Sequence, residues 1–387
     1  MGSFLGQPSA VDLLSANEDL IYDYSITINT ATSTFAPAVN FLFTINTTLY
    51  SFEVNSNAFY DKLTAGSNVT YLFEVNVSQE LRNFFDNNTF FDATRLTTAT
   101  NEFIFTVSVR ANDYLPDANG ILTLTPSVSA NDIKVLNALQ TDLSLYQYTA
   151  TDIDFMTKAI QSKKVFNSTE YKLFVYGSAT INTVRFETLD KFLTVIDEGV
   201  VSLVNTNNIN VLDLDTDGLS TYTFVDGNIP TVDDEVKYVR VTAGNWDGIT
   251  YTKHSIDRLF EYIWRRCDLL EVEFQNDLGV TEKVYFDRFD IIENHNSLKY
   301  YEPNVGNLKL SGEVTTVYNV TKENLTIAEM NYLSLIFKSG IVRLTYNDVQ
   351  FSAVIETEKT TFKKNFENSY SLVASFEQGL IDRTFNN

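Results

Sequence analysis

The amino-acid sequence predicts a mainly β protein, with antiparallel β-sandwich or barrel domains, a few packed helices and an α+β module at the C-terminus. Three observations support this fold class. Apolar and polar residues alternate in many short stretches, which is typical of strands with one buried face. Aromatic residues make up 13% of the 387 residues and favour pleated strands. Only 6 Pro and 15 Gly are present, which excludes collagen-like and Pro-rich sequences.

The first region, residues 1–130, is expected to form a β-sandwich or barrel. Its clearest strand is 21–28, where apolar and polar residues alternate. A turn is predicted at 117–120, Asp-Ala-Asn-Gly, and a short helix at 79–85. Further strands are expected at 41–45, 49–54, 71–77, 103–109 and 121–125.

The middle region, residues 131–250, is expected to combine helices, strands and acidic loops. Asn and Asp at its start can cap a helix over 131–143. Thr151 and Asp154 resemble the capping box of a second helix, over 151–160. Strands are expected at 172–176, 183–189 and 238–243, with loops or hairpin tips over 205–235.

The last region, residues 251–387, predicts a helix packed on an antiparallel sheet. Apolar residues recur at helical spacing over 255–267, which predicts one helix. Thr326 and Glu329 form a capping box for a second helix, which should end at Ser339-Gly340. Strands are expected at 270–274, 283–292, 341–346, 351–356 and 370–376, with turns at 276–279, 293–296 and 347–348.

One motif suggests a metal. Asp213, Asp215 and Asp217 match the opening of a calcium loop, in which alternate carboxylates converge on a hard cation. Phe224 occupies the position where a bidentate Glu normally closes the loop, although Asp226, two residues later, could substitute. Calcium is therefore the one cofactor that the sequence suggests, and a solvated acidic turn between strands is the alternative.

The sequence offers few parts for catalysis. His254 and His295 are the only histidines and Cys267 is the only cysteine, so most acid–base, nucleophilic and zinc sites lack their usual residues. No phosphate-binding loop, dinucleotide fingerprint or nucleophile elbow is present. The chain is therefore expected not to be an enzyme.

Charge and hydropathy limit the classes of partner that the chain is expected to bind. With 28 Lys+Arg against 50 Asp+Glu, the net charge of −22 argues against direct nucleic-acid binding, which depends on basic residues. No window of about 18 apolar residues predicts membrane insertion. The N-terminus shows no basic and apolar signal segment, which predicts synthesis and folding in a cytosol.

The order of predicted elements over residues 283–378 is similar to that of a known class of proteins. A polar strand region leads into Leu-Thr-Ile-Ala-Glu at 325–329 and a helix that ends Leu-Ile-Phe-Lys-Ser-Gly at 335–340. A hairpin over 342–356 and a strand from 370 to 373 follow. This order of elements resembles the end module of distal-tail or connector-type tail and baseplate proteins of tailed phages that infect Bacteroidota.

The resemblance implies a structural virion protein of the tail, baseplate or head–tail connector, assembled in the host cytoplasm. Such a protein would form a homo-oligomeric ring and dock other phage structural proteins. The alternative is a carbohydrate-binding or adhesin module on a cell surface, which would use Trp246 and the calcium loop. That alternative requires an export route that the N-terminus does not show.

Overall fold

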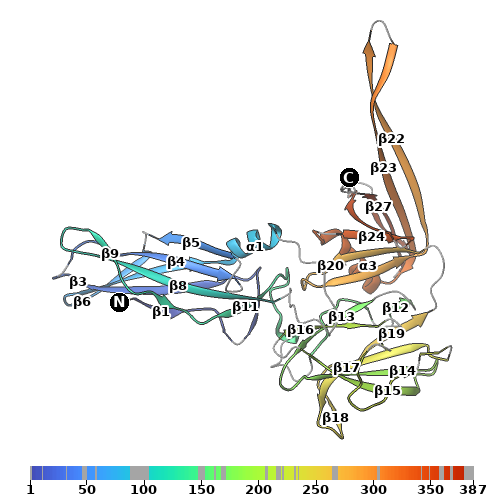
Figure 1. The fold of residues 1–387 in the computed structure, drawn as a ribbon, viewed down its shortest axis with the longest axis horizontal. Helices are drawn as coiled ribbons and strands as arrows, with labels where there is room; N and C mark the ends of the chain where they lie inside the picture. The colour runs from blue at the N-terminus through green and yellow to red at the C-terminus, as the bar shows by residue number, and fades with distance from the viewer. Residues whose placement is uncertain are drawn as a thin grey trace, which may run out of the picture. The chain divides into compact units, whose positions relative to one another are not determined.

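The computed structural model describes two compact units, each mainly β with few helices, which confirms the predicted fold class (Figure 1). The described residues up to Tyr146 form the first unit, and those from Ile153 onward form the second. The described residues are 2–10, 12–31, 33–45, 50–56, 59–87, 104–146, 153–160, 163–166, 171–204, 208–214, 219, 222–230, 232–233, 235–263, 269–302, 306–340, 342–347, 349–356, 361–366 and 369–378.

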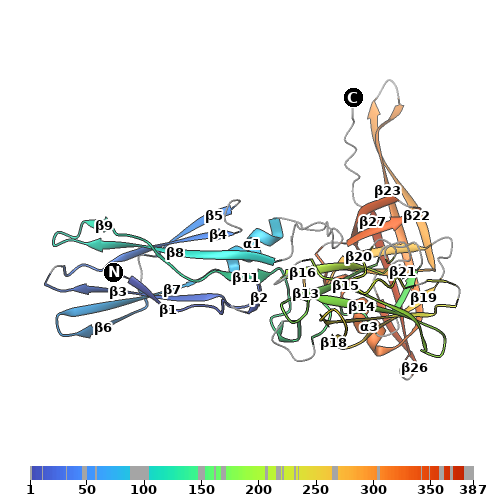
Figure 2. The same cartoon turned by 60° about the horizontal axis from the view of Figure 1, so that its bottom comes forward.

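The first unit is a sandwich of two sheets (Figure 2). One sheet has the strand order β1-β3-β7-β6, and the other has the path β2-β11-β8-β4-β5, with β9 and β10 also paired to β8. Its elements are β1 Gly2–Gly6, β2 Leu13–Ser15, β3 Ile21–Asn29, β4 Ala38–Ile45, β5 Tyr50–Ser56, β6 Asp61–Ala65, β7 Asn68–Asn76, α1 Ser78–Asn87, β8 Ile104–Pro116, β9 Leu122–Leu124, β10 Val128–Ser129, β11 Ile133–Leu136 and the 3-10 helix η1 Ser144–Tyr146.

One apolar core joins the two sheets of this unit. Tyr24 from β3 and Phe73 from β7 pack in the same cluster as Phe41 from β4 and Val107 from β8, and all four are fully buried. The alternation seen in the sequence places these side chains on the inner faces. The predicted helix and turn are also confirmed, since α1 covers 79–85 and Asp117 Oδ1 accepts hydrogen bonds from the backbone of Asn119 and Ile121 within the turn.

A buried carboxylate holds the N-terminal strand onto the sandwich. Asp113 of β8 is fully buried, and its two oxygens accept hydrogen bonds from the Gly2 backbone N–H and the Tyr24 hydroxyl, both at 2.6 Å. A side chain at position 2 would collide with the Tyr24 ring, since a Cβ there would lie 2.2 Å from its hydroxyl oxygen. Burial and the neighbouring carboxylate raise the pKa of Tyr24 well above its usual value.

The second unit contains three sheets. The path β12-β19-β17-β14-β15, with β18 on β17, makes six strands, and β13 pairs with β16. The third sheet has the path β21-β20-β24-β25-β27-β23-β22, with β26 on β27. The elements are β12 Lys163–Phe166, β13 Lys172–Gly177, β14 Thr183–Leu189, β15 Val195–Ser202, β16 Asn208–Asp213, β17 Tyr238–Trp246, β18 Tyr251–Lys253, β19 Arg258–Ile263, β20 Leu270–Gln275, β21 Thr281–Phe286, β22 Phe289–Glu302, β23 Gly306–Leu325, α3 Ile327–Ser334, the 3-10 helix η2 Ile336–Lys338, β24 Val342–Tyr346, β25 Val349–Ile355, β26 Thr361–Phe366 and β27 Ser369–Gln378.

The helix α3 packs on the eight-stranded sheet, as predicted for the C-terminal α+β module. Leu333 of α3 and Ile336 of η2 are buried in one core with Phe274 of β20 and Phe376 of β27. The predicted capping box is present at Thr326, whose hydroxyl accepts the Glu329 backbone N–H at 3.2 Å, while the Glu329 carboxylate accepts the Thr326 N–H at 2.8 Å.

Thr326→Ala is expected to destabilise the second unit by about 1 kcal/mol, because it leaves an N–H of the first turn without its side-chain acceptor. In a thermal melt this corresponds to a fall in Tm of roughly 2–4 °C. Thr326→Ser keeps the hydroxyl and is the matched control. Equal Tm values for the alanine and serine variants would show that the cap contributes nothing.

The helix predicted over 255–267 is wrong. The described part of this segment contains the strand β19, Arg258–Ile263, which pairs with β12 on one side and β17 on the other. Phe260 and Tyr262 are buried in alternation with more exposed neighbours, so the period is two rather than 3.6. The apolar spacing of this segment also fits a helix, but hydrogen bonding to a strand on each side stabilises the extended conformation.

The two helices predicted in the middle region are also wrong. The segment of the first predicted helix, 131–143, contains the strand β11, which pairs with β2 and β8. Leu139, in the same segment, is 58% exposed. In the second, Ile153 forms a bridge with Ser255, and the segment 153–160 is extended or irregular. Of the predicted capping box, Thr151 lies outside the described residues, and both carboxylate oxygens of Asp154 accept hydrogen bonds from the Arg258 guanidinium.

Three smaller expectations also change. The stretch 205–235 contains the strand β16, Asn208–Asp213, in addition to loops. The predicted turn at 293–296 is continuous strand, where His295 pairs with Val314 in the middle of β22 and β23. The single strand expected over 283–292 is divided between β21 and β22.

Candidate functional site

The most distinctive feature of the second unit is a long β-hairpin made of β22 and β23 (Figure 1). The two strands pair from Phe289 opposite Val320 to Glu302 opposite Gly306. The neighbouring strand β27 pairs with β23 only over Val317–Leu325. Among the described residues, the part of the hairpin beyond this point pairs only with itself, and we call this part, residues 293–302 and 306–316, the arm.

The arm is long for a two-stranded element. The segment 306–316 spans roughly 35 Å at about 3.3 Å per residue. A two-stranded hairpin alone is marginally stable in water, and each of its edges presents backbone N–H and C=O groups that another strand can bind. Both edges of the arm are therefore unpaired among the described residues.

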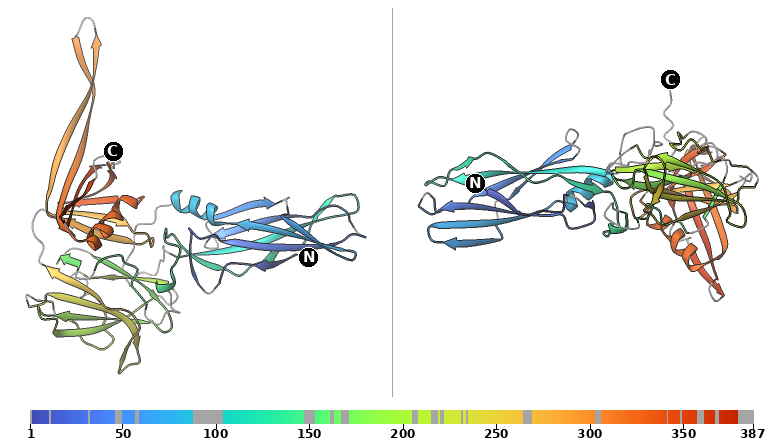
Figure 3. Two further views of the ribbon diagram at one scale, coloured as in Figure 1. Left: turned by 180° about the vertical axis from the view of Figure 1, so that it is seen from behind. Right: turned by 90° about the horizontal axis from the view of Figure 1, so that it is seen from below.

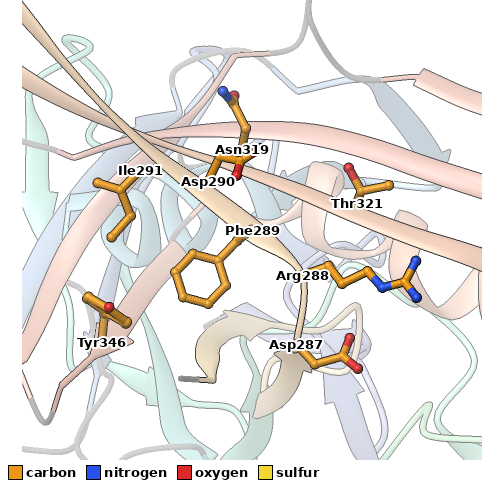
Figure 4. A pocket seen from close by; sticks show the side chains of 8 residues that line it. All are labelled: Asp287, Arg288, Phe289, Asp290, Ile291, Asn319, Thr321 and Tyr346. Atoms are coloured by element: carbon orange, nitrogen blue, oxygen red, sulfur yellow. The ribbon is translucent and has the colours of Figure 1, made fainter. Parts of the chain in front are cut away.

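A shallow pocket of about 550 Å³ lies at the base of the hairpin (Figure 4). The rings of Phe289 and Tyr346 meet edge to face with centroids 5.3 Å apart. The side chains of Asp287 and Arg288 point away from that ring pair, and Arg288 forms an exposed ion pair with Glu323. The lining residues are Asp287, Arg288, Phe289, Asp290, Ile291, Asn319, Thr321 and Tyr346. The polar groups of this set are two carboxylates, one guanidinium, one amide and the hydroxyls of Thr321 and Tyr346.

A buried lysine lies elsewhere in the same unit. Lys163 of β12 is 7% exposed, and its ammonium donates hydrogen bonds to the Tyr171 hydroxyl, the Tyr332 hydroxyl and the Lys283 carbonyl oxygen. The ammonium also lies 4.4 Å from the centre of the Tyr171 ring and 4.8 Å from that of Tyr332. Burial lowers the pKa of Lys163 to about 7, an effect that the nearby Glu282 opposes and Lys322 reinforces.

The surroundings of Lys163 indicate a structural role. Glu282 is 2% exposed, and one of its oxygens accepts hydrogen bonds from the Asn276 side chain at 2.7 Å and the Lys158 backbone at 2.6 Å. Burial raises the pKa values of Tyr171 and Tyr332. The pocket at the hairpin base does not include any of these residues. The cluster joins β12 of the six-stranded sheet to β21 and α3 of the eight-stranded sheet, and so connects the two sheets. Nothing in the sequence around Lys163 distinguished it from a surface lysine.

The residues of the predicted calcium loop are only partly described. Asp215 and Asp217 lie outside the described residues. Asp213 is fully buried at the end of β16, where its backbone N–H donates to the Tyr222 hydroxyl. The carboxylate of Asp226 accepts the backbone N–H groups of Val200 and Asn228, both at 3.2 Å. In the described part of the chain, no three His, Cys, Asp or Glu side chains gather as a metal site requires.

The other residues singled out from the sequence lie apart. Trp246 is half-buried at the end of β17, opposite Tyr251 of β18. His254 follows β18, where its backbone pairs with Ala243 and Ile153. Cys267 lies outside the described residues. The structure thus places the two described residues, Trp246 and His254, on or beside the β17–β18 pair.

The chain matches no protein-family model and no curated protein. Within the described residues, no helix has the length and apolar character needed to cross a membrane.

Proposed function

We propose that the protein is a structural component of a tailed-bacteriophage virion, in the tail, baseplate or head–tail connector. It forms a homo-oligomeric ring and docks neighbouring virion proteins. It is made and assembled in the host cytoplasm. The arm is the observation that carries this proposal, because a strand pair of this length without a sheet behind it is suited to binding another chain.

Two further features support an assembly role. The resemblance of residues 283–378 to phage tail and baseplate modules covers the hairpin, α3 and the strands that hold them. Two buried polar clusters, around Asp113 and around Lys163, are engaged in contacts within the chain. A protein of this composition acts through the surfaces that it presents rather than through a reaction.

The particle itself provides the test. Host cells infected with the phage that carries this gene are expected to release particles that contain several copies of the protein. Mass spectrometry of gradient-purified virions would detect it. Electron microscopy should then show a ring of density into which the two units fit. A washed cell-surface fraction from the same culture is the control. Absence from the particles, together with presence on the cell surface, would favour the adhesin alternative instead.

A further inference from the structure

The turn between β14 and β15, residues 190–194, presents two apolar side chains to solvent, and we call it the tip. Phe192 is 76% exposed and Leu193 is 51% exposed. The tip has a defined shape, because Asp190 Oδ1 accepts the backbone N–H of Phe192 at 2.8 Å and that of Thr194 at 2.9 Å. The two apolar side chains are therefore presented on an ordered turn.

The backbone of Leu193 makes this exposure informative. Its φ angle is 64°, in the left-handed region, which is unfavourable for residues with a Cβ and is most readily occupied by glycine. A glycine at this position would form the same turn without that strain. Because the Leu193 side chain is half exposed, its burial within the chain offsets little of the cost. A strained residue of this kind points to a functional contact, here one made by the leucine side chain.

The tip also carries a cation. The Lys191 ammonium lies 4.9 Å from the centre of the Phe192 ring, and within the described residues it forms no salt bridge. Together with the Asp190 carboxylate it leaves the tip without net charge, in a chain whose net charge is −22. The tip therefore approaches an acidic surface with little repulsion, and Lys191 is available to a carboxylate outside the chain.

The pocket at the base of the hairpin has the complementary character. Its apolar lining consists of Phe289, Ile291 and Tyr346, and its carboxylates are those of Asp287 and Asp290. Ile291 is 42% exposed and the two rings are half-buried, so apolar surface is accessible in the pocket. Its volume of about 550 Å³ lies in the range of pockets that enclose drug-sized ligands, which are larger than two side chains.

The charge of this pocket is negative. Its one guanidinium, on Arg288, is paired at 3.3 Å with Glu323, which does not line the pocket. Asp287 lies near Lys322, where it opposes the fall in the pKa of this lysine that burial causes. Asp290 is exposed and forms no salt bridge with any described residue. Asp290 is therefore the carboxylate most available to a cation from another molecule.

We propose that the tip of one copy of this chain binds in the hairpin-base pocket of a second copy. Phe192 and Leu193 pack against the apolar lining, and Lys191 lies beside Asp290. Within one copy these surfaces do not meet, because Phe192 is 76% exposed and the pocket lining includes no residue of the tip. Two chains that each carry −22 repel one another, so contact between copies requires a place where a cation of one meets carboxylates of the other. The tip and the pocket provide such a place.

The two surfaces lie on different sheets of the second unit. The tip joins β14 to β15, and the pocket lies at the base of the hairpin β22–β23. Figure 1 and the left view of Figure 3 show the arm extending from the second unit on the side away from β14 and β15. An interface between two different surfaces of identical chains is heterologous, and it generates a ring when the rotation closes. The inference deepens the proposed function and rests on it for the ring, but its test requires only the purified protein.

The first experiment uses two full-length variants with complementary defects. The tip variant carries Phe192→Ser and Leu193→Gly, which remove the apolar side chains. The pocket variant carries Asp290→Lys and Ile291→Lys, which make the pocket repel Lys191. Sedimentation velocity is expected to show that the wild type self-associates and that each variant alone is monomeric. An equimolar mixture is expected to form dimers and nothing larger, because one intact tip meets one intact pocket.

Matched controls place similar changes elsewhere on the same unit. Ile249 and Ile229 are 87% and 59% exposed, close to the values for the tip, and Ile249→Ser with Ile229→Ser should assemble like the wild type. Ile256→Lys with Asp257→Lys is the control for the pocket variant, since Ile256 is 38% exposed. Circular dichroism confirms that each variant is folded. The proposal is overturned if the wild type is monomeric at all concentrations, if the tip or pocket variant assembles normally, if their mixture stays monomeric, or if a control fails as severely as its matched variant.

Leu193→Gly alone separates recognition from folding. Glycine adopts the left-handed backbone without strain, so the Tm of this variant is expected to equal or exceed that of the wild type. Its self-association is expected to weaken at least about tenfold, because the leucine side chain is lost from the contact. Unchanged self-association, or a loss of association accompanied by a clear fall in Tm, would contradict the role given to Leu193.

A charge exchange tests the pairing of Lys191 with Asp290. Lys191→Glu and Asp290→Lys are each expected to weaken self-association, by about tenfold, because each brings like charges together. Mixing the two variants should restore association, since every tip then meets a pocket of opposite charge in the other variant. Failure of this rescue would contradict the proposed pairing. Self-association of the pure protein through the tip, combined with its absence from virions, would refute the proposed function and leave the tip–pocket contact standing. A monomeric wild type that is nevertheless present in virions would do the reverse.

Discussion

Lys163→Met is expected to reduce a rise in stability with pH that the wild-type second unit should show between pH 7 and 9, a rise to which Lys322 contributes in the same direction because burial also lowers its pKa. The folded unit releases the Lys163 proton near pH 7, whereas the unfolded chain keeps it up to the ordinary lysine pKa of 10.5. Between these values the unfolded state binds more protons, so raising the pH favours the folded state. Two pH units in this window correspond to about 2–3 kcal/mol in the free energy of unfolding.

Urea unfolding at pH 7, 8 and 9 measures this effect, with m-values compared to confirm that the transition is unchanged. The upper limit of pH 9 avoids ionisation of tyrosines, whose ordinary pKa is 10.0. Lys363 is an exposed lysine on β26, and Lys363→Met is the control that should keep the wild-type slope. Parallel slopes for wild type and Lys163→Met would contradict a proton-linked buried lysine.

The same variant should also unfold more easily at every pH. Its methionine cannot bind the Tyr171 and Tyr332 hydroxyls or the Lys283 carbonyl, which lie between the two sheets. Buried polar groups that lose a partner cost about 1–3 kcal/mol each, an amount that bound water can reduce. The slope is the diagnostic measurement because packing defects shift stability without following the titration of one group.

Asp113→Ala is expected to destabilise the first unit by about 2–4 kcal/mol, because it leaves two buried donors without their acceptor. The donors are the Tyr24 hydroxyl and the Gly2 N–H, which the carboxylate holds at 2.6 Å. Asp113→Asn retains one acceptor oxygen and should lose less. Differential scanning calorimetry of the full chain measures this loss. If the two units unfold in separate transitions, only the transition of the first unit should move to a lower Tm.

A double-mutant cycle identifies the contact responsible. Tyr24→Phe removes one donor, so Asp113→Ala combined with Tyr24→Phe is expected to cost clearly less than the sum of the single changes. Strict additivity would show that the loss in Asp113→Ala arises from packing rather than from the hydrogen bond. Ser25→Ala, on the neighbouring position of β3, controls for the loss of a hydroxyl group.

Local sequence rules succeeded where neighbours in the chain determine the structure. The capping box at Thr326 and Glu329 satisfies backbone groups three residues apart, and the turn at 117–120 is closed by Asp117 itself. The alternation over 21–28 predicts β3 because one face of that strand is buried. Such signals depend on short-range geometry, and the order of the residues displays them directly.

Rules of the same kind failed where pairing between distant segments decides the outcome. The segment at 258–263 has apolar residues at a spacing compatible with a helix, yet it lies between β12 and β17 as a strand. The polar residues at 293–296 predicted a turn and lie within the long hairpin, since their backbone groups pair with β23. Lys163 has no distinctive sequence context, because its partners lie 8, 120 and 169 residues away.

The sequence by itself determined the strand-rich class, the acidic charge, the scarcity of histidine and cysteine, and the helix that begins at Thr326. Only the tertiary structure decided which strands became central and that, among the described residues, β22 and β23 extend past β27 as an arm. The physical reason is that composition and alternation act within a few residues, whereas the partner of a strand is chosen by hydrogen bonds and burial across the whole chain.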